Sequence, residues 1–71
     1  MSADPVVLTV NGERWEAAGG STVATLVDAW CPSPRGVAVA VDGAVVPRSA
    51  WDVTALVPGA TVELVSAAAG G

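Results

Sequence analysis

Residues 5–17 read PVVLTVNGERWEA, in which two strand-like runs flank the dipeptide Asn11-Gly12. Asn-Gly is the strongest short-range hairpin signal, because a two-residue turn of this type requires positive φ at both central positions. The run before the turn alternates large apolar residues with Val7 and Thr9, a two-residue period that is typical of a strand with one buried face. The segment therefore predicts a β-hairpin at the start of the domain.

The segment STVATLVDAWC, residues 21–31, predicts a short amphipathic helix. Ser21 or Thr22 can cap its N-terminus by accepting a hydrogen bond from an unpaired backbone amide. Because position 24 is Ala, we expect no full capping box. The apolar residues of this segment recur at helical spacing and share one stripe of the helix surface, which consists of Val23, Leu26, Val27 and Trp30.

Residues 36–48, GVAVAVDGAVVPR, predict a second hairpin that turns at Asp42-Gly43. Pro47 has no backbone N–H to donate, so the second strand of this hairpin should lie at an edge of the sheet. Residues 49–56, SAWDVTAL, read as an irregular connection with a short turn of helix. TVELVS, residues 61–66, predicts the last strand.

The order hairpin, helix, hairpin, strand predicts an α+β domain in which one helix covers one face of a mixed sheet. The last strand needs a partner and the first strand is apolar throughout, so we expect these two side by side in the centre. One hairpin then lies on each flank, which gives a five-stranded sheet in the order 2-1-5-3-4. We expect residues 1–66 to form this domain and residues 67–71 to form a flexible tail that ends in Gly-Gly.

One helix leaves the other face of such a sheet uncovered. By strand alternation the uncovered face carries Val7, Thr9, Ala38, Ala40, Glu63 and Val65. Apolar atoms are common on protein surfaces, so an ordinary surface is one interpretation of this face. A contiguous patch of small apolar side chains would instead suit docking to a larger protein. The docking residues expected on this basis are Ala38, Ala40, Val65 and Val7.

The composition disfavours several classes of function. The chain of 71 residues has no His and one cysteine, Cys31, so an internal disulfide is impossible and a zinc or iron site is not expected. Three scattered arginines, no lysine and seven acidic residues give a net charge of −4, which disfavours nucleic acid as a partner. Charged residues interrupt every apolar stretch, so we expect no membrane-spanning helix, and the N-terminus lacks a signal-peptide pattern. A lone cysteine without an export signal fits a cytoplasmic protein.

The side chains offer little catalytic chemistry. Without His or Lys, the common general bases and Schiff-base nucleophiles are missing, and the hydroxyl groups have no base to activate them. Cys31 closes the predicted helix, where the negative end of the helix dipole disfavours a thiolate. We interpret Trp15 and Trp30 as large buried core residues, and Trp51 as a similar residue whose N–H bonds a loop carbonyl. The chain is therefore not expected to be an enzyme.

The C-terminal residues VSAAAGG, 65–71, leave the terminal carboxylate as the remaining candidate reactive group. At neutral pH a terminal carboxylate is an anion and a poor electrophile, so it must be activated, for example by attack on the α-phosphate of ATP inside another enzyme. Glycine passes through a narrow channel where a Cβ would collide, and five extended residues span at most about 17 Å. We expect Gly71 to carry the chemistry, on a stalk of Gly70, Ala69 and Ala68. An inert terminus is the alternative.

Several segments spread over most of the chain carry a family pattern: VNGE at 10–13, STVATLVD at 21–28, GVAVAVDGAVVPRSAW at 36–51, PGATVELV at 58–65 and the terminal Gly-Gly. Together they resemble the ThiS family, the sulfur carrier proteins of thiamine biosynthesis. VPRSAW, residues 46–51, is the most discriminating piece, because other ubiquitin-like sulfur carriers generally lack this pattern. The resemblance implies the ubiquitin-like β-grasp fold and supports the strand order 2-1-5-3-4.

The resemblance also implies a cycle that partner enzymes run. An E1-like adenylating enzyme of the ThiF type uses Mg-ATP to convert the Gly71 carboxylate to an acyl-adenylate. Sulfur from a cysteine desulfurase or sulfurtransferase replaces AMP and leaves a thiocarboxylate, and thiazole synthase of the ThiG type takes that sulfur for the thiazole ring of thiamine. In this cycle the chain itself binds no cofactor.

Two alternatives stay open at this stage. The chain could be a related sulfur carrier, either for molybdopterin, against which VPRSAW argues, or for a secondary metabolite. It could also be a β-grasp interaction module whose tail is inert.

Overall fold

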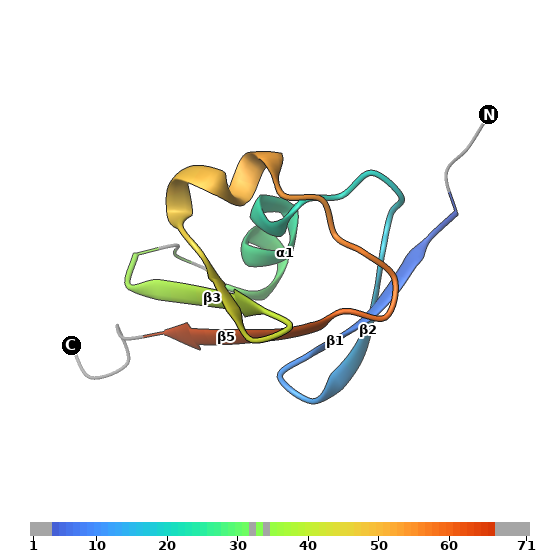
Figure 1. Ribbon diagram of the computed structural model, residues 1–71, viewed down its shortest axis with the longest axis horizontal. Helices are drawn as coiled ribbons and strands as arrows, with labels where there is room; N and C mark the ends of the chain where they lie inside the picture. The colour runs from blue at the N-terminus through green and yellow to red at the C-terminus, as the bar shows by residue number, and fades with distance from the viewer. Residues whose placement is uncertain (1–3, 32, 34, 67–71) are drawn as a thin grey trace.

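The computed structural model describes residues 4–31, 33 and 35–66, which fold into a sheet with helical segments on one side (Figure 1). In chain order the elements are β1 (Val6–Val10), β2 (Glu13–Ala17), α1 (Val23–Trp30), β3 (Val37–Val41), β4 (Ala44–Val46), the 3₁₀ helix η1 (Arg48–Val53) and β5 (Thr61–Ser66). This is the order that the sequence predicts. Within the described residues, no helix is long and apolar enough to cross a membrane.

The five strands lie in the order β2-β1-β5-β3-β4, which confirms the predicted topology. The central strands β1 and β5 are parallel, and the other neighbouring pairs are antiparallel. Helix α1 and η1 both lie above the sheet in Figure 1, so the lower face of the sheet is left open. Pro47 follows the edge strand β4 directly, where its missing N–H costs no ladder bond.

Both hairpins turn on two residues with positive φ. The angles are 51° and 82° at Asn11 and Gly12, and 49° and 85° at Asp42 and Gly43. Positive φ at both central residues marks the type I′ turn, whose twist matches that of the flanking strands. These turns set the registers that bring the apolar residues of each hairpin to the covered face of the sheet.

The core lies between α1 and the covered face of the sheet. Three residues of the predicted helical stripe, Val23, Leu26 and Val27, are buried, and Trp30 is half-buried. The sheet contributes four further side chains that solvent hardly reaches: Leu8, Val10, Val39 and Val62. Burying one Val or Leu side chain contributes about 1.5–3 kcal/mol, so this apolar layer is the main source of stability.

The N-terminus of α1 corrects one expectation from the sequence. Thr22, and not Ser21, is the N-cap, which makes Thr25 the N3 residue. The backbone N–H of Thr25 donates to Oγ1 of Thr22 at 3.4 Å, and the backbone N–H of Thr22 donates to Oγ1 of Thr25 at 3.3 Å. The expected absence of a capping box is wrong, because a threonine hydroxyl takes the place of the usual Glu or Gln.

The tryptophans also differ from the expectation. Trp15 and Trp30 are only half-buried, and they pack edge to face with ring centroids 6.3 Å apart at the margin of the core. Trp51 is the buried tryptophan, and its Nε1–H donates to the carbonyl oxygen of Val46 at 3.0 Å. The predicted core position therefore holds for Trp51, whereas Trp15 and Trp30 pack against the core and stay partly exposed. The expected bond from the Trp51 N–H to a backbone carbonyl is present, but its acceptor is the last residue of β4 and not a loop residue.

Candidate functional site

Strand β5 connects the rigid sheet to the C-terminal candidate site. It lies in the centre of the sheet, between β1 and β3, and its last residue, Ser66, is in register with Val37 of β3. Gly71 follows five positions later (71 − 66). The sequence-predicted site residues Gly71, Gly70, Ala69 and Ala68 lie outside the described residues.

The side chains of the two turn residues Asn11 and Asp42 hold the backbone of β5. The Asp42 carboxylate accepts a hydrogen bond from the N–H of Thr61 at 2.9 Å, at the start of the strand. Further along, Oδ1 of Asn11 accepts from the N–H of Leu64 at 2.8 Å, and Nδ2 of Asn11 donates to the Leu64 carbonyl oxygen at 3.3 Å. Each hairpin turn thus anchors the strand that leads to the C-terminus.

The open face of the sheet carries three of the four predicted docking residues close together. Ala38 is in register with Val65, and the next outward-facing residue of β3, Ala40, is in register with Glu63. Val45 of β4 lies opposite Ala40 on the other side. We call the group Ala38, Ala40, Val45 and Val65 the open-face patch.

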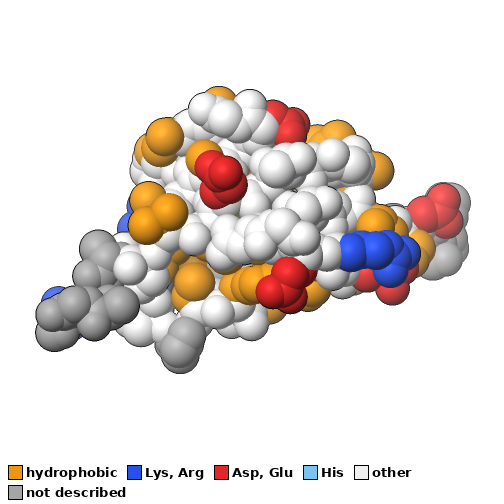
Figure 2. Space-filling model, turned by 90° about the horizontal axis from the view of Figure 1, so that it is seen from below, with side chains coloured by type: hydrophobic (Ala, Val, Ile, Leu, Met, Phe, Trp, Pro, Cys, Tyr) orange, Lys and Arg blue, Asp and Glu red, His pale blue; other side chains and the backbone are white. Residues whose placement is uncertain are grey.

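Two large side chains dominate the open-face patch, because Val45 is 75% exposed and Val65 is 62% exposed. In the view from below in Figure 2, apolar side chains reach the surface with an acidic group beside them. Sequence reasoning missed Val45. The turn at 42–43 pairs position 40 with position 45, so the hairpin register contained the signal that would have found it.

The fourth predicted docking residue, Val7, does not lie beside this patch. Thr9 is in register with Thr61, and the Val7 carbonyl accepts from the N–H of Gly59, before β5 begins. Val7 lies two residues before Thr9 and Val65 four residues after Thr61, so about 20 Å separates them along the strand direction. The structure therefore brings Ala38, Ala40 and Val65 together and places Val7 at the opposite end of the open face.

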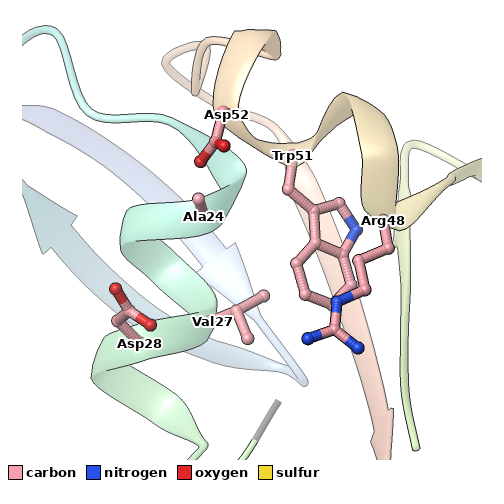
Figure 3. A pocket seen from close by; sticks show the side chains of 6 residues that line it. All are labelled: Ala24, Val27, Asp28, Arg48, Trp51 and Asp52. Atoms are coloured by element: carbon pink, nitrogen blue, oxygen red, sulfur yellow. The ribbon is translucent and has the colours of Figure 1, made fainter. Parts of the chain in front are cut away.

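A shallow hollow of about 170 Å³ lies on the other side of the molecule, between α1 and η1 (Figure 3). Its lining consists of Ala24, Val27, Asp28, Arg48, Trp51 and Asp52. The Arg48 side chain runs along the indole of Trp51, with its guanidinium carbon 5.8 Å from the ring centroid. This lining contains a cation, two carboxylates and an indole, but no nucleophile.

The other candidate groups have simple structural roles. Cys31 is a free, half-buried cysteine that forms the C-cap of α1, where its N–H donates to the Val27 carbonyl oxygen at 2.8 Å. Within the described part of the chain, no group of three or more His, Cys, Asp and Glu side chains is placed to hold a metal ion.

A sheet in the order β2-β1-β5-β3-β4 under one main helix defines a small ubiquitin-like protein of the β-grasp class. A family model described as the ThiS family matches residues 8–71. A search of curated proteins finds no match. The chain belongs to the ThiS family.

A solved structure agrees with the family match. The crystal structure of a thiamine biosynthesis protein (ThiS) from Geobacter metallireducens is similar to this chain, with a TM-score of 0.74 and 31% sequence identity. The alignment covers 86% of this chain and 93% of that one. As a family member the chain is a sulfur carrier protein of thiamine biosynthesis and not a catalyst, and its partners belong in general to that pathway.

Proposed function

We propose that Gly71 is the residue on which this carrier holds sulfur. In the first step a carboxylate oxygen of Gly71 attacks the α-phosphorus of ATP, and pyrophosphate leaves. Hydrosulfide that attacks the acyl carbon displaces AMP and leaves a thiocarboxylate at the end of the chain. If the persulfide of a donor protein attacks instead, AMP leaves and an acyl disulfide forms, and a thiol reductant then cleaves its S–S bond to release the thiocarboxylate. This thiocarboxylate donates its sulfur for formation of the thiazole ring of thiamine.

The position of β5 carries this proposal. A carrier terminus needs a fixed base, and β5 provides one because it is central, is paired on both sides and ends only five positions before Gly71 (71 − 66). The family match supports the same residue, because it extends through Gly70 to Gly71. The remaining stalk, Ala68 and Ala69, has side chains small enough for a narrow channel.

The proposed partners each supply a step that this chain lacks. An E1-like adenylating enzyme of the ThiF type binds the Mg-ATP, and a cysteine desulfurase or sulfurtransferase delivers the sulfur. Thiazole synthase of the ThiG type accepts it. This chain contributes the acyl group and the surface by which the partners recognise it.

We propose the open-face patch as the surface that docks on the adenylating enzyme. Val65 belongs to the patch and lies one residue before the end of β5, so a partner seated there is next to the start of the tail. Val45 and Val65 supply large exposed apolar groups, and the small Ala38 and Ala40 let a partner approach the sheet closely. Val7 lies about 20 Å from Val65 along the strand direction, outside the open-face patch.

Intact mass spectrometry tests the proposal directly. The chain is incubated with a ThiF-type enzyme, Mg-ATP and a sulfur source, and we expect its mass to rise by the difference between sulfur and oxygen. Fragmentation should place the change on Gly71. A matched variant that lacks Gly71 should show no change under the same conditions.

The partner enzyme must be shown to be competent on another ThiS family protein in the same assay. If that protein gains sulfur and this chain keeps its original mass, the proposal is wrong. Sulfur gain at any residue other than Gly71 would contradict the proposed site and leave the carrier function standing.

A further inference from the structure

The side chain of Asn11 makes the hydrogen bonds to β5 that backbone groups would make if β1 continued beyond Val10. The backbone contacts between β1 and β5 run as far as the bond from the Asn11 N–H to the Val62 carbonyl oxygen at 2.9 Å. At that point the main chain turns away toward β2. The Asn11 amide group continues the ladder, because it both accepts from the Leu64 N–H and donates to the Leu64 carbonyl.

This double role requires asparagine chemistry. Asn11 has a φ of 51°, a left-handed conformation that Asn tolerates better than most residues. An amide side chain carries one acceptor and one donor group, which matches the C=O and N–H that a backbone neighbour would present to Leu64. Asn11 therefore forms the turn between β1 and β2 and also bonds the backbone of β5.

The two hydrogen bonds from Asn11 hold the part of β5 that is nearest the tail. On the β3 side, Leu64 and Ser66 are in register with Val39 and Val37. On the β1 side, within the described residues, the Asn11 amide is the group that bonds Leu64. Release of this clamp would expose both polar backbone groups of Leu64 and give the end of β5 more conformations.

We propose that Asn11 is a positioning residue for the C-terminal carrier group, and this proposal rests on the function proposed for Gly71. By fixing Leu64 on the β1 side, Asn11 helps to hold the end of β5, which pairs with β3 as far as Ser66. If this end of β5 frayed, a partner that binds the tail in extended form would also have to order the frayed residues of the strand. Each additional residue that must be ordered carries a conformational entropy cost, which lowers the efficiency of adenylation.

Asp42 offers a matched control. It is also the first residue of a type I′ turn, its φ is 49°, and its side chain also bonds the backbone of β5. Its partner, however, is Thr61, at the end of β5 far from the tail. Glycine tolerates positive φ, so Asn11→Gly and Asp42→Gly each remove one clamp and keep the turn.

The experiment compares these two variants in amide hydrogen exchange and in adenylation by the ThiF-type enzyme. For Asn11→Gly we expect exchange at Leu64 to be about tenfold faster and kcat/KM to fall about 3- to 10-fold, mainly through KM. Two hydrogen bonds are lost, and the shorter one, at 2.8 Å, is alone worth about this much. For Asp42→Gly we expect faster exchange at Thr61 with kcat/KM close to that of the wild type. Equal effects of the two variants on kcat/KM, or no effect of Asn11→Gly, would overturn the proposal.

Asn11→Asp is the second variant, in case the glycine variant does not fold. It keeps an acceptor for the Leu64 N–H and removes the donor for the Leu64 carbonyl, so its kcat/KM should lie between those of the wild type and Asn11→Gly. A value equal to that of the wild type would contradict the role of the amide.

The wild-type chain separates the two proposals. If the wild-type chain is not adenylated, the function proposed for Gly71 fails. If it is adenylated and all variants are adenylated equally well, only the role proposed for Asn11 fails.

Discussion

The Nε1–H of Trp51 donates to the carbonyl oxygen of Val46 at 3.0 Å, and this bond ties η1 to the last residue of β4. It gives a structural reason for the spacing between Val46 and Trp51 in VPRSAW, residues 46–51. Pro47 ends the edge strand and is the N-cap of η1, and Arg48 then lies over the Trp51 ring. Residues 46–51 therefore hold η1 against the end of β4, at one edge of the sheet.

Trp51→Phe tests this hydrogen bond. The substitution keeps an aromatic ring in the core but leaves the Val46 carbonyl without its partner, so we expect the free energy of unfolding to fall by about 2 kcal/mol. Urea denaturation followed by circular dichroism measures it. Trp30→Phe is the matched control at a half-buried tryptophan, and it should cost about 1 kcal/mol or less. Equal losses in the two variants would show that the bond to Val46 contributes little.

Local chemistry made most of the fold predictable. Asn11-Gly12 and Asp42-Gly43 fixed both hairpins, because few residue pairs accept positive φ twice. The helical spacing of Val23, Leu26 and Val27 likewise predicted which side of α1 is buried. The capping box escaped prediction because the prediction placed N3 at position 24, whereas the N-cap is Thr22 and N3 is Thr25. A threonine also takes the place of the usual Glu or Gln there.

Burial and distance were harder to predict, because they depend on how elements meet in space. Periodicity assigns a tryptophan to a face but does not tell whether its element lies at the margin of the core, which is where Trp15 and Trp30 pack. Alternation likewise placed Val7 and Val65 on one face. Their separation follows from the parallel register of β1 against β5, which no local pattern contains.

Thr22→Ala should destabilise the domain by about 1 kcal/mol, because it removes the N-cap acceptor, which forms one half of the capping box. Thr22→Ser keeps the hydroxyl and should retain most of the stability. The hydrogen bonds of the box are long, at 3.3 and 3.4 Å, so the reciprocal contribution of Thr25 should be smaller. A double-mutant cycle with Thr25→Ala, measured by urea denaturation, separates the two terms. A Thr22→Ala variant as stable as the wild type would contradict the assigned N-cap.

Cys31→Ser separates two chemical forms of bound sulfur. Cys31 is the single cysteine of the chain and could in principle hold sulfur as a persulfide, whereas our proposal places sulfur on the Gly71 carbonyl. We expect the variant to gain sulfur as fully as the wild type when incubated with the partner enzyme, Mg-ATP and a sulfur source. Intact mass spectrometry before and after treatment with a reductant measures this, because a reductant removes persulfide sulfur. Loss of the gain in Cys31→Ser would move the carrier position to the thiol.

Val65→Asp tests the open-face patch. Val65 is 62% exposed, so a new carboxylate stays in water in the free chain but would be desolvated against an apolar partner surface. We expect affinity for the adenylating enzyme, measured by isothermal titration calorimetry, to fall at least about tenfold. Val53→Asp is the matched control, because Val53 is 81% exposed but belongs to η1, on the side of the sheet opposite the patch. If both variants bind as tightly as the wild type, the patch is not the docking surface. If Val53→Asp alone weakens binding, the partner docks on the helical side.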